Sequence, residues 1–205
     1  FFQVNDFAAA LADYSVYFAH AKPHAQIYYN RGVLYLAQER RQEAIADFTQ
    51  ALALDDRYQQ ARLQRGQALL QIERWAEAEA DLRSYLAQDP AHKEASYALS
   101  EALRRQEKWS AAEAAMSQLL LRTPDDFRAH KERAFIRLKQ QQPKAALTDL
   151  NYCLRHQTED ADIWYFTGIA HREAGAADAA LDAFVHCLDL QKHDAEALCQ
   201  RGGLR

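Results

Sequence analysis

Histidine and cysteine are the side chains in this sequence whose spacing could bind a metal or supply a nucleophile. His20 and His24 lie four residues apart, which would place two imidazoles on one face of a helix. Pro23 stands between them and ends that helix, so we interpret both as surface histidines and predict no metal site. The sequence also lacks a glycine-rich phosphate loop, a GxSxG motif and an HExxH motif. We therefore predict that the protein is not an enzyme, with no catalytic residue and no cofactor.

The three cysteines do not indicate a disulfide framework in a chain of 205 residues. Cys153 and Cys187 stand at equivalent places of a repeating pattern, and helices stacked side by side lie about 8–10 Å apart, too far for an unstrained bridge. We interpret these two as core thiols and Cys199 as a buried or groove thiol. Because unpaired cysteines are typical of a reducing compartment, a cytoplasmic localisation is the default.

Arginine and aspartate recur together at a separation of sixteen residues. The pairs are Arg31 with Asp47, Arg65 with Asp81, and Arg133 with Asp149. Where the arginine is absent from this series the aspartate is absent too, as in Leu99 with Ala115 and Thr167 with Ala183. Since one buried charge alone is costly, partners that appear and vanish together indicate structural ion pairs between two helices. The alternative is that all are solvated charges whose match is coincidence.

Small residues recur every 34 positions and define the elements that must hold these side chains. One series is Ala10, Ala44, Ala78, Ala112, Ala146 and Ala180, and the other is Gly32, Gly66, Ser100, Ala134, Gly168 and Gly202. An unbroken period of this length is typical of a repeat array. Small residues are needed where helix backbones approach closely, so each repeat is predicted to be two antiparallel helices that cross at the small pair.

Composition excludes several classes of protein. The chain has 6 Gly and 4 Pro and is rich in Ala, Leu, Gln, Glu and Arg, which favours helices almost throughout. A formal net charge of −4 gives no general attraction to nucleic acid or to an anionic membrane. No run approaches the ~20 apolar residues of a membrane span. We predict neither nucleic-acid binding nor membrane insertion.

Residues 25–58 show the repeat most clearly. Their marker residues are Tyr28, Gly32, Tyr35, Ala44, Phe48 and Ala51, and the next two repeats end in Asp89-Pro90 and Thr123-Pro124. In these features the chain resembles the tetratricopeptide repeat (TPR) family over essentially its whole length. The resemblance implies an all-α fold, a right-handed α-α superhelix of antiparallel helix pairs, and a scaffold rather than a catalyst.

The register divides the chain into the parts of one TPR array. Residues 1–24 are a partial repeat with its second helix, residues 25–58, 59–92, 93–126, 127–160 and 161–194 are full repeats, and residues 195–205 begin another. Pro143 falls in the first turn of a second helix, where proline is tolerated. Because neither end carries the polar capping repeat that solenoids need, we expect a fragment of a longer array.

In TPR proteins the first helix of each pair lines a concave groove, so the resemblance places partner-binding residues there. These are Tyr29, Asn30, Val33, Leu63, Gln64, Gln67, Tyr97, Glu101, Arg104, Arg128, Lys131, Phe135, Tyr165, Phe166 and Ile169. Aromatic rings on a face that folding need not fill favour recognition of an extended peptide or a helix. A basic band of Arg104, Arg105, Arg128, Lys131 and Lys139 would attract an acidic segment of that partner. The alternative is a solvated face neutralised by Glu94, Glu101 and Glu132.

Some TPR cochaperones clamp the C-terminal carboxylate of heat-shock chaperones through Lys and Asn side chains of successive first helices. Here Tyr29 and Val33 stand where Lys and Asn would be required, and Gln64 replaces the next Asn. We therefore predict that the chain does not bind heat-shock chaperones in this way.

The leading functional hypothesis is a non-catalytic protein–protein interaction scaffold. Two alternatives stay open. The array could form homo-oligomers through an aromatic edge or its open ends, or it could be the targeting or substrate-recruiting TPR region of a larger multidomain enzyme. Light scattering over a range of concentrations separates self-assembly from binding of a partner.

Overall fold

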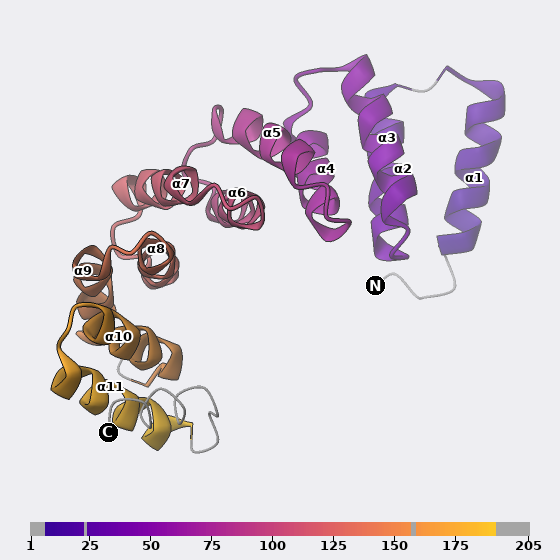
Figure 1. Ribbon diagram of the computed structural model, residues 1–205. Coiled ribbons are helices and arrows are strands. Elements are labelled where there is room, and N and C mark those ends of the chain that lie inside the picture. The colour runs from indigo at the N-terminus through magenta and orange to yellow at the C-terminus, as the bar shows by residue number, and fades with distance from the viewer. Residues whose placement is uncertain (1–6, 23, 157–158, 192–205) are drawn as a thin grey trace. The chain divides into compact units, whose positions relative to one another are not determined.

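The computed structural model describes residues 7–22, 24–156 and 159–191, and these residues form eleven helices and no strand (Figure 1). The prediction of an all-α fold is confirmed. The chain falls into two compact units that divide between Gln106 and Glu107. The predicted start of a further repeat at residues 195–205, with Cys199 and Gly202, lies outside the described residues.

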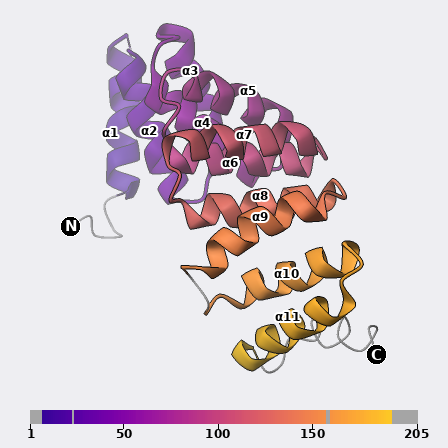
Figure 2. The same cartoon turned by 90° about the vertical axis from the view of Figure 1, so that its left-hand side faces the viewer.

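Helices follow one another in pairs along the chain. Unit 1 contains α1 (Phe7–His20), α2 (Ala25–Ala37), α3 (Arg41–Leu54), α4 (Gln59–Gln71), α5 (Trp75–Leu86) and α6 (Lys93–Arg105). Unit 2 contains α7 (Trp109–Arg122), α8 (Phe127–Lys139), α9 (Pro143–Leu154), α10 (Ala161–Glu173) and α11 (Ala177–Leu190). Figure 2 shows α8 with α9 and α10 with α11 as antiparallel neighbours in unit 2.

One residue in each turn between the helices of a pair adopts the left-handed backbone region. The φ angles are 59° at Glu39, 62° at Glu73, 56° at Glu107, 58° at Gln141 and 81° at Gly175. These positions share the 34-residue period, so the same turn recurs in every full repeat. Only glycine adopts this conformation without a steric penalty from Cβ, and only the last of the five turns has one.

Local signals fix where the helices of unit 2 begin. The Asp126 carboxylate accepts the N–H of Ala129 at 3.1 Å, and the Asp160 carboxylate accepts the N–H of Asp162 at 3.0 Å. Such side-chain caps satisfy N–H groups that have no partner inside the helix. Helix α9 begins at Pro143, so the predicted place of this proline in the first turn is confirmed.

The helices of a pair meet where a small residue of the first faces a large side chain of the second. A Cβ added to Gly32 would lie 2.7 Å from the Phe48 ring, and one added to Gly168 would lie 2.5 Å from the Phe184 ring. Both rings are fully buried. The close approach of the two backbones therefore requires glycine at these positions.

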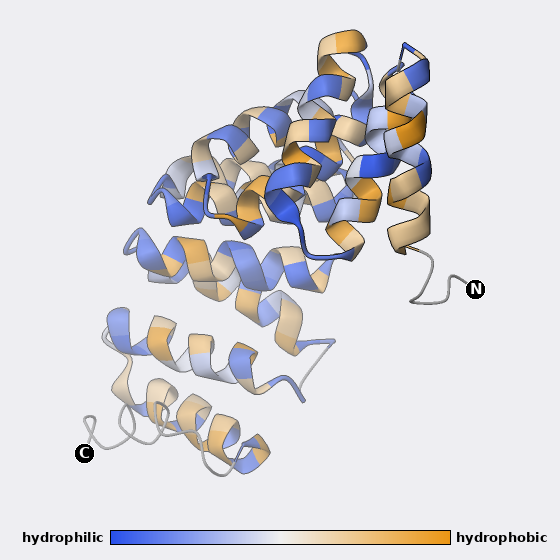
Figure 3. Ribbon diagram, turned by 90° about the vertical axis from the view of Figure 1, so that its right-hand side faces the viewer, coloured by the Kyte–Doolittle hydropathy of each residue, from blue (hydrophilic) through white to orange (hydrophobic). Residues whose placement is uncertain are grey.

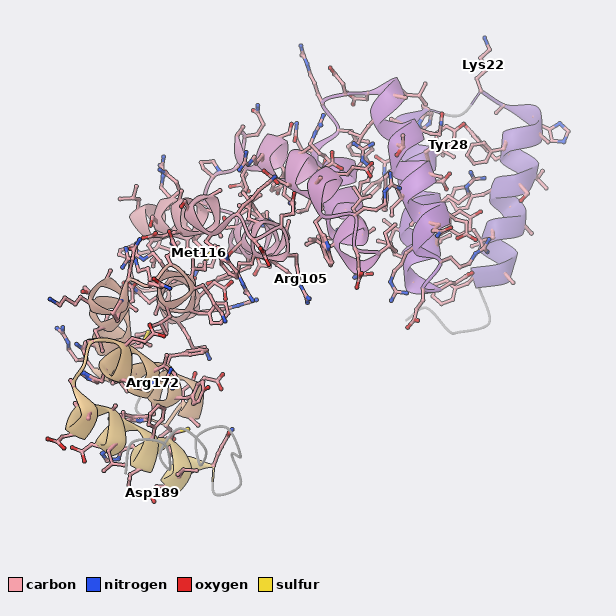
Figure 4. All side chains as sticks on the ribbon, in the orientation of Figure 1. Lys22, Tyr28, Arg105, Met116, Arg172 and Asp189 are labelled. Carbon is pink, nitrogen blue, oxygen red and sulfur yellow. The ribbon has the colours of Figure 1, made fainter. Side chains whose placement is uncertain are left out.

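Each pair also packs against the next pair within its unit. Helix α3 packs on α4 and α5 on α6 in unit 1, and α7 packs on α8 and α9 on α10 in unit 2. Figure 3 shows hydrophobic and hydrophilic residues interspersed along each helix, as expected for helices that are covered on one side and exposed on another. Helix α1 has no buried residue, and its Phe18 ring lies 4.9 Å from the Tyr28 ring of α2. Figure 4 labels Tyr28.

Candidate functional site

The predicted groove residues lie on the first helices of the pairs, which are α2, α4 and α6 in unit 1 and α8 and α10 in unit 2. All of them are half-buried or exposed. Side chains with this degree of exposure contact neighbouring helices and still present surface to a ligand.

A recess of about 360 Å³ lies between α8 and α10 of unit 2. It is lined by Phe135, Leu138, Lys139, Tyr165, Phe166, Ile169, Arg172 and Glu173, and we call it the aromatic recess. Four of these residues, Phe135, Tyr165, Phe166 and Ile169, belong to the predicted groove set. Figure 4 labels Arg172, which lies in the last turn of α10 beside Glu173.

The rings of the aromatic recess pack on one another and on the core. The centroid of Phe166 lies 5.6 Å from that of Phe135 and 5.7 Å from that of Tyr165. Phe166 and Ile169 also pack against the buried cluster that contains Leu150. Because these contacts hold the rings, the recess is formed before any ligand arrives, which lowers the entropic cost of binding.

Basic groups outnumber acidic ones at the aromatic recess. The Lys139 ammonium lies 5.4 Å from the centroid of the Phe135 ring, within the range of a cation–π interaction, and its side chain is exposed. Arg172 adds a second cation to the lining and Glu173 a single carboxylate. The recess therefore offers an apolar interior beside a net positive edge.

Lys131 differs from its expected role in a basic band. Its ammonium lies 2.8 Å from an Asp160 carboxylate oxygen and 3.3 Å from one of Asp162. Burial lowers the pKa of Lys131, but the two carboxylates outweigh this effect and raise the pKa above its ordinary value. Lys131 is thus neutralised by the start of the next first helix. Arg105 similarly lies 3.8 Å from Glu101.

The aromatic groove residue of the first full repeat also packs into the fold. The Tyr29 ring lies 5.8 Å from the Phe48 ring and 5.0 Å from the Tyr58 ring. Asn30 accepts a hydrogen bond of 2.8 Å from the Gln26 amide. The Tyr29 ring is therefore half-buried, because Tyr58 at the end of the same repeat covers part of it.

Each arginine of the sixteen-residue series meets its aspartate through two nitrogens. The Nε or Nη2 distances to the carboxylate are 2.7 Å for Arg31–Asp47, 2.7 Å for Arg65–Asp81 and 2.7 Å for Arg133–Asp149. The aspartates are 4%, 4% and 1% exposed, respectively. The hydrogen bonds that Arg31 donates to Asp47 raise the pKa of Arg31. These are partly buried bidentate pairs between the two helices of one repeat.

Asp149 lies at the centre of a larger network, which sequence reasoning missed. It accepts a hydrogen bond of 2.8 Å from Arg137, and the His130 ring lies 2.8 Å away. Arg137 also donates to Glu113 of α7 at 2.8 Å, and Gln140 donates to the same carboxylate at 2.8 Å. One signal was present in the sequence, because Arg137 and Glu113 stand where the first full repeats have Leu69 and Ile45.

The described residues include neither a reactive cysteine nor a metal site. Cys153 and Cys187 are buried thiols, and burial raises the pKa of Cys153 to about 11, so this thiol is protonated and unreactive near neutral pH. Over the residues with assigned positions, no group of three or more His, Cys, Asp and Glu side chains is arranged to hold a metal ion. Within the same residues, no helix has both the length and the apolar character to cross a membrane.

Comparisons with known proteins give consistent results. Models of the tetratricopeptide repeat match residues 25–58, 63–127 and 99–165, which together cover more than half of the chain. Among curated proteins, none matches the sequence.

Three solved structures illustrate the similarity of fold. YrrB, reported as a TPR protein with an unusual peptide-binding site, is 18% identical with a TM-score of 0.80, over 98% of this chain and 100% of that one. MamA from Desulfovibrio magneticus RS-1 is 17% identical with a TM-score of 0.74, over 83% of this chain and 97% of that one. A TPR protein from Thermus thermophilus, TTC0263, is 17% identical with a TM-score of 0.56, over 88% of this chain and 98% of that one.

Proposed function

Because the chain belongs to the tetratricopeptide repeat family, we propose that it is a non-catalytic scaffold that binds a segment of a partner protein on its first helices. The observation that carries the proposal is the aromatic recess between α8 and α10. The similar fold of YrrB, which has a reported peptide-binding site, supports peptide recognition as the mode of binding.

The lining of the aromatic recess favours one kind of peptide segment. Its volume of about 360 Å³ falls in the range of small ligand sites, and Phe135 and Phe166 present aromatic surface to it. Burying one large apolar side chain of the partner there would contribute about 1.5–3 kcal/mol. Lys139 and Arg172 then favour a carboxylate next to that side chain. We infer a partner segment, extended or helical, that places an apolar or aromatic residue beside an acidic one.

A displayed library of short random peptides, selected for binding to the full chain, tests this proposal. We expect selected peptides to combine an aromatic or large aliphatic residue with an adjacent Asp or Glu. Phe166→Ala should weaken their binding by about tenfold or more, which corresponds to about 1.4 kcal/mol. Lys139→Glu should weaken acidic peptides and spare matched peptides in which the acid is replaced by its amide.

Using two variants distinguishes a loss of binding from a loss of folded structure. Phe166 packs on the core, so Phe166→Ala requires a check of helix content, whereas Lys139 is exposed and its charge can be reversed without disturbing packing. Leu121→Ala is the control, because Leu121 is 74% exposed on the second helix α7 and does not line the recess. Peptides that bind both recess variants as tightly as the wild type would show that this recess is not the site.

A further inference from the structure

A second recess lies in unit 1 and is lined mainly by the second helices α3 and α5. It measures about 650 Å³ and lies between α3 and α5, with Gln42, Ile45 and Gln50 on one side, Glu77 and Asp81 on the other, and Leu69 of α4 in its lining. We call it the polar recess. None of the predicted groove residues lines it.

The equivalent place in unit 2 is occupied by an arginine of the chain itself. Two repeats further along the sequence, Leu69, Ile45 and Asp81 correspond to Arg137, Glu113 and Asp149. The Arg137 guanidinium donates to Glu113 at 2.8 Å, to Asp149 at 2.8 Å and to the backbone carbonyl of Ala145 at 3.1 Å. It therefore spans the space between α7 and α9. The uncharged Leu69 leaves the corresponding space between α3 and α5 open.

Two of the acceptors that bind the Arg137 guanidinium in unit 2 have counterparts in unit 1. Asp81 is only 4% exposed, and in the described part of the chain it accepts hydrogen bonds from Arg65 alone. Asp149 accepts from Arg133 and from Arg137 and also contacts His130. An ionised carboxylate has about four lone-pair sites, so Asp81 retains acceptor capacity. The carbonyl of Glu77 corresponds to that of Ala145.

The three arginines that line the polar recess, Arg31, Arg65 and Arg74, already have partners. Arg31 donates through two nitrogens to Asp47 at 2.7 Å. Arg65 bonds through all three of its nitrogens, two to Asp81 and one to Thr49 at 3.1 Å. Arg74 donates through two nitrogens to Glu77. The arginine donors of the lining are thus engaged, whereas the Asp81 carboxylate retains acceptor capacity. A guanidinium, with five donors and no acceptor, is the side-chain group that complements such a lining.

We propose that the polar recess binds the arginine side chain of a partner polypeptide, which takes the place in unit 1 that Arg137 takes in unit 2. The guanidinium bonds to Asp81 and the Glu77 carbonyl, and the methylene stem packs on Ile45 and Leu69. The polar recess shares no lining residue with the aromatic recess, so it is a separate site and does not depend on the function proposed for that recess.

The test uses N-acetyl-arginine amide and N-acetyl-citrulline amide, which share a shape but differ in charge and in the donors of the terminal group. Amide signals of the full-length chain are followed by NMR as each compound is added. We expect the arginine compound to shift signals of Gln42, Gln50 and Glu77 and to bind about tenfold more tightly than the citrulline compound. Equal binding of the two compounds would overturn the proposal.

A short peptide with a central arginine should bind at least as tightly as the single amide, and weaker binding of the peptide would rule out a polypeptide as the occupant.

Variants that fill the polar recess from within should abolish arginine binding. The double variant Ile45→Glu with Leu69→Arg copies the arrangement of unit 2, and Ala80→Arg introduces an arginine from an exposed position of α5 with less risk to the core. Leu69→Met, which conserves volume and adds no donor, should retain binding. Phe166→Ala should also retain it, because that residue lies in the aromatic recess. Retention of arginine binding by both filled variants would refute the assignment.

Discussion

The junction between α3 and α5 in unit 1 and the junction between α7 and α9 in unit 2 have the same repeat register but different interiors. In unit 1, Ile45 and Leu69 are buried at 7% and 2% exposure, and an open recess lies beside them. In unit 2 the corresponding Glu113 and Arg137 form an ion pair of 2.8 Å that extends to Asp149. The contrast shows that one repeat register accommodates either an open recess or an interior filled by a charged side chain.

The shared backbone explains why both interiors are tolerated. Small residues bring the helices of each pair together, as Gly66 does beside Leu82 in unit 1 and Ala134 does within the core cluster of unit 2. The buried ion network is not needed to define the fold, because the desolvation of its charges offsets much of their attraction. What the network changes is whether space remains for another molecule.

The largest expected effect comes from removing the carboxylate that serves both an arginine pair and the network. Asp149→Ala leaves Arg133 and Arg137 without their shared buried partner, so we expect a loss of about 3–5 kcal/mol of stability. Asp81→Ala in unit 1 should cost clearly less, because it leaves only Arg65 without a carboxylate, beside an open recess. Urea denaturation followed by circular dichroism measures both, with hydrogen exchange to locate the loss. Equal losses would show that the extra contacts of Asp149 contribute nothing.

A second contrast concerns how tightly the two helices approach in different pairs. Gly168→Ala places a methyl group 2.5 Å from the Phe184 ring, so we expect a destabilisation of about 1–3 kcal/mol. Gly66→Ala meets the flexible Leu82 side chain at 3.1 Å, and the gain in helix propensity, about 1 kcal/mol, offsets the crowding. Thermal unfolding of the two variants should therefore separate them. A Gly66→Ala variant as unstable as Gly168→Ala would mean that Leu82 cannot move.

The network should also make the stability of unit 2 depend on pH through Glu113. Burial raises the pKa of Glu113, but hydrogen bonds from Arg137 and Gln140 outweigh burial and hold the pKa below its ordinary value. The stability that Glu113 contributes is therefore complete above the ordinary glutamate pKa and is lost as pH falls through the lower folded value. We expect an effect of no more than about 1 kcal/mol, seen in urea midpoints between about pH 6 and 3. Glu113→Gln should flatten that part of the profile, and an unchanged profile would contradict this role.

The smallest expected effect is the same in both units, because the turns are alike. Glu73→Gly and Gln141→Gly remove a Cβ from a left-handed residue, which relieves about 1–2 kcal/mol, while the freer unfolded chain costs about 0.5–1 kcal/mol. Each variant should gain roughly 0.5 kcal/mol in urea denaturation. Gly175→Ala is the matched reverse change and should lose a similar amount. Opposite signs in the two units would show that the turns are not equivalent.

The sequence predicts the helix pairs because their signals recur locally. The small-residue series marks the crossings at Gly32, Gly66 and Gly168, and Pro143 marks the start of α9. The spacing of Arg31 and Asp47 was readable for the same reason, since both residues lie in one repeat and the pair returns in two others. When a residue pair recurs at the same positions of several repeats, comparing the repeats within one chain reveals it.

Contacts between repeats could not be read in this way. Lys131 is neutralised by Asp160 and Asp162, which belong to the start of the next first helix and act there as cap and first-turn residue. The Arg137–Glu113 pair occurs once among the described residues, so no second copy within the chain exposes it. The aromatic recess depends on ring orientations, which arise from packing between repeats rather than from position in the register.

The matching of residue sizes within each helix pair has a consequence for building hybrid proteins. Glycine faces phenylalanine in α2–α3 and α10–α11, whereas Ala134 shares its cluster with Leu150 in α8–α9. A chimera that joins α8 to a second helix bearing phenylalanine would press the Ala134 methyl group into a ring. Crossover points placed between helix pairs keep each small residue with the large side chain that it faces. Segments exchanged at these points should therefore give folded recombinants, whereas segments exchanged at the turn inside a pair should not.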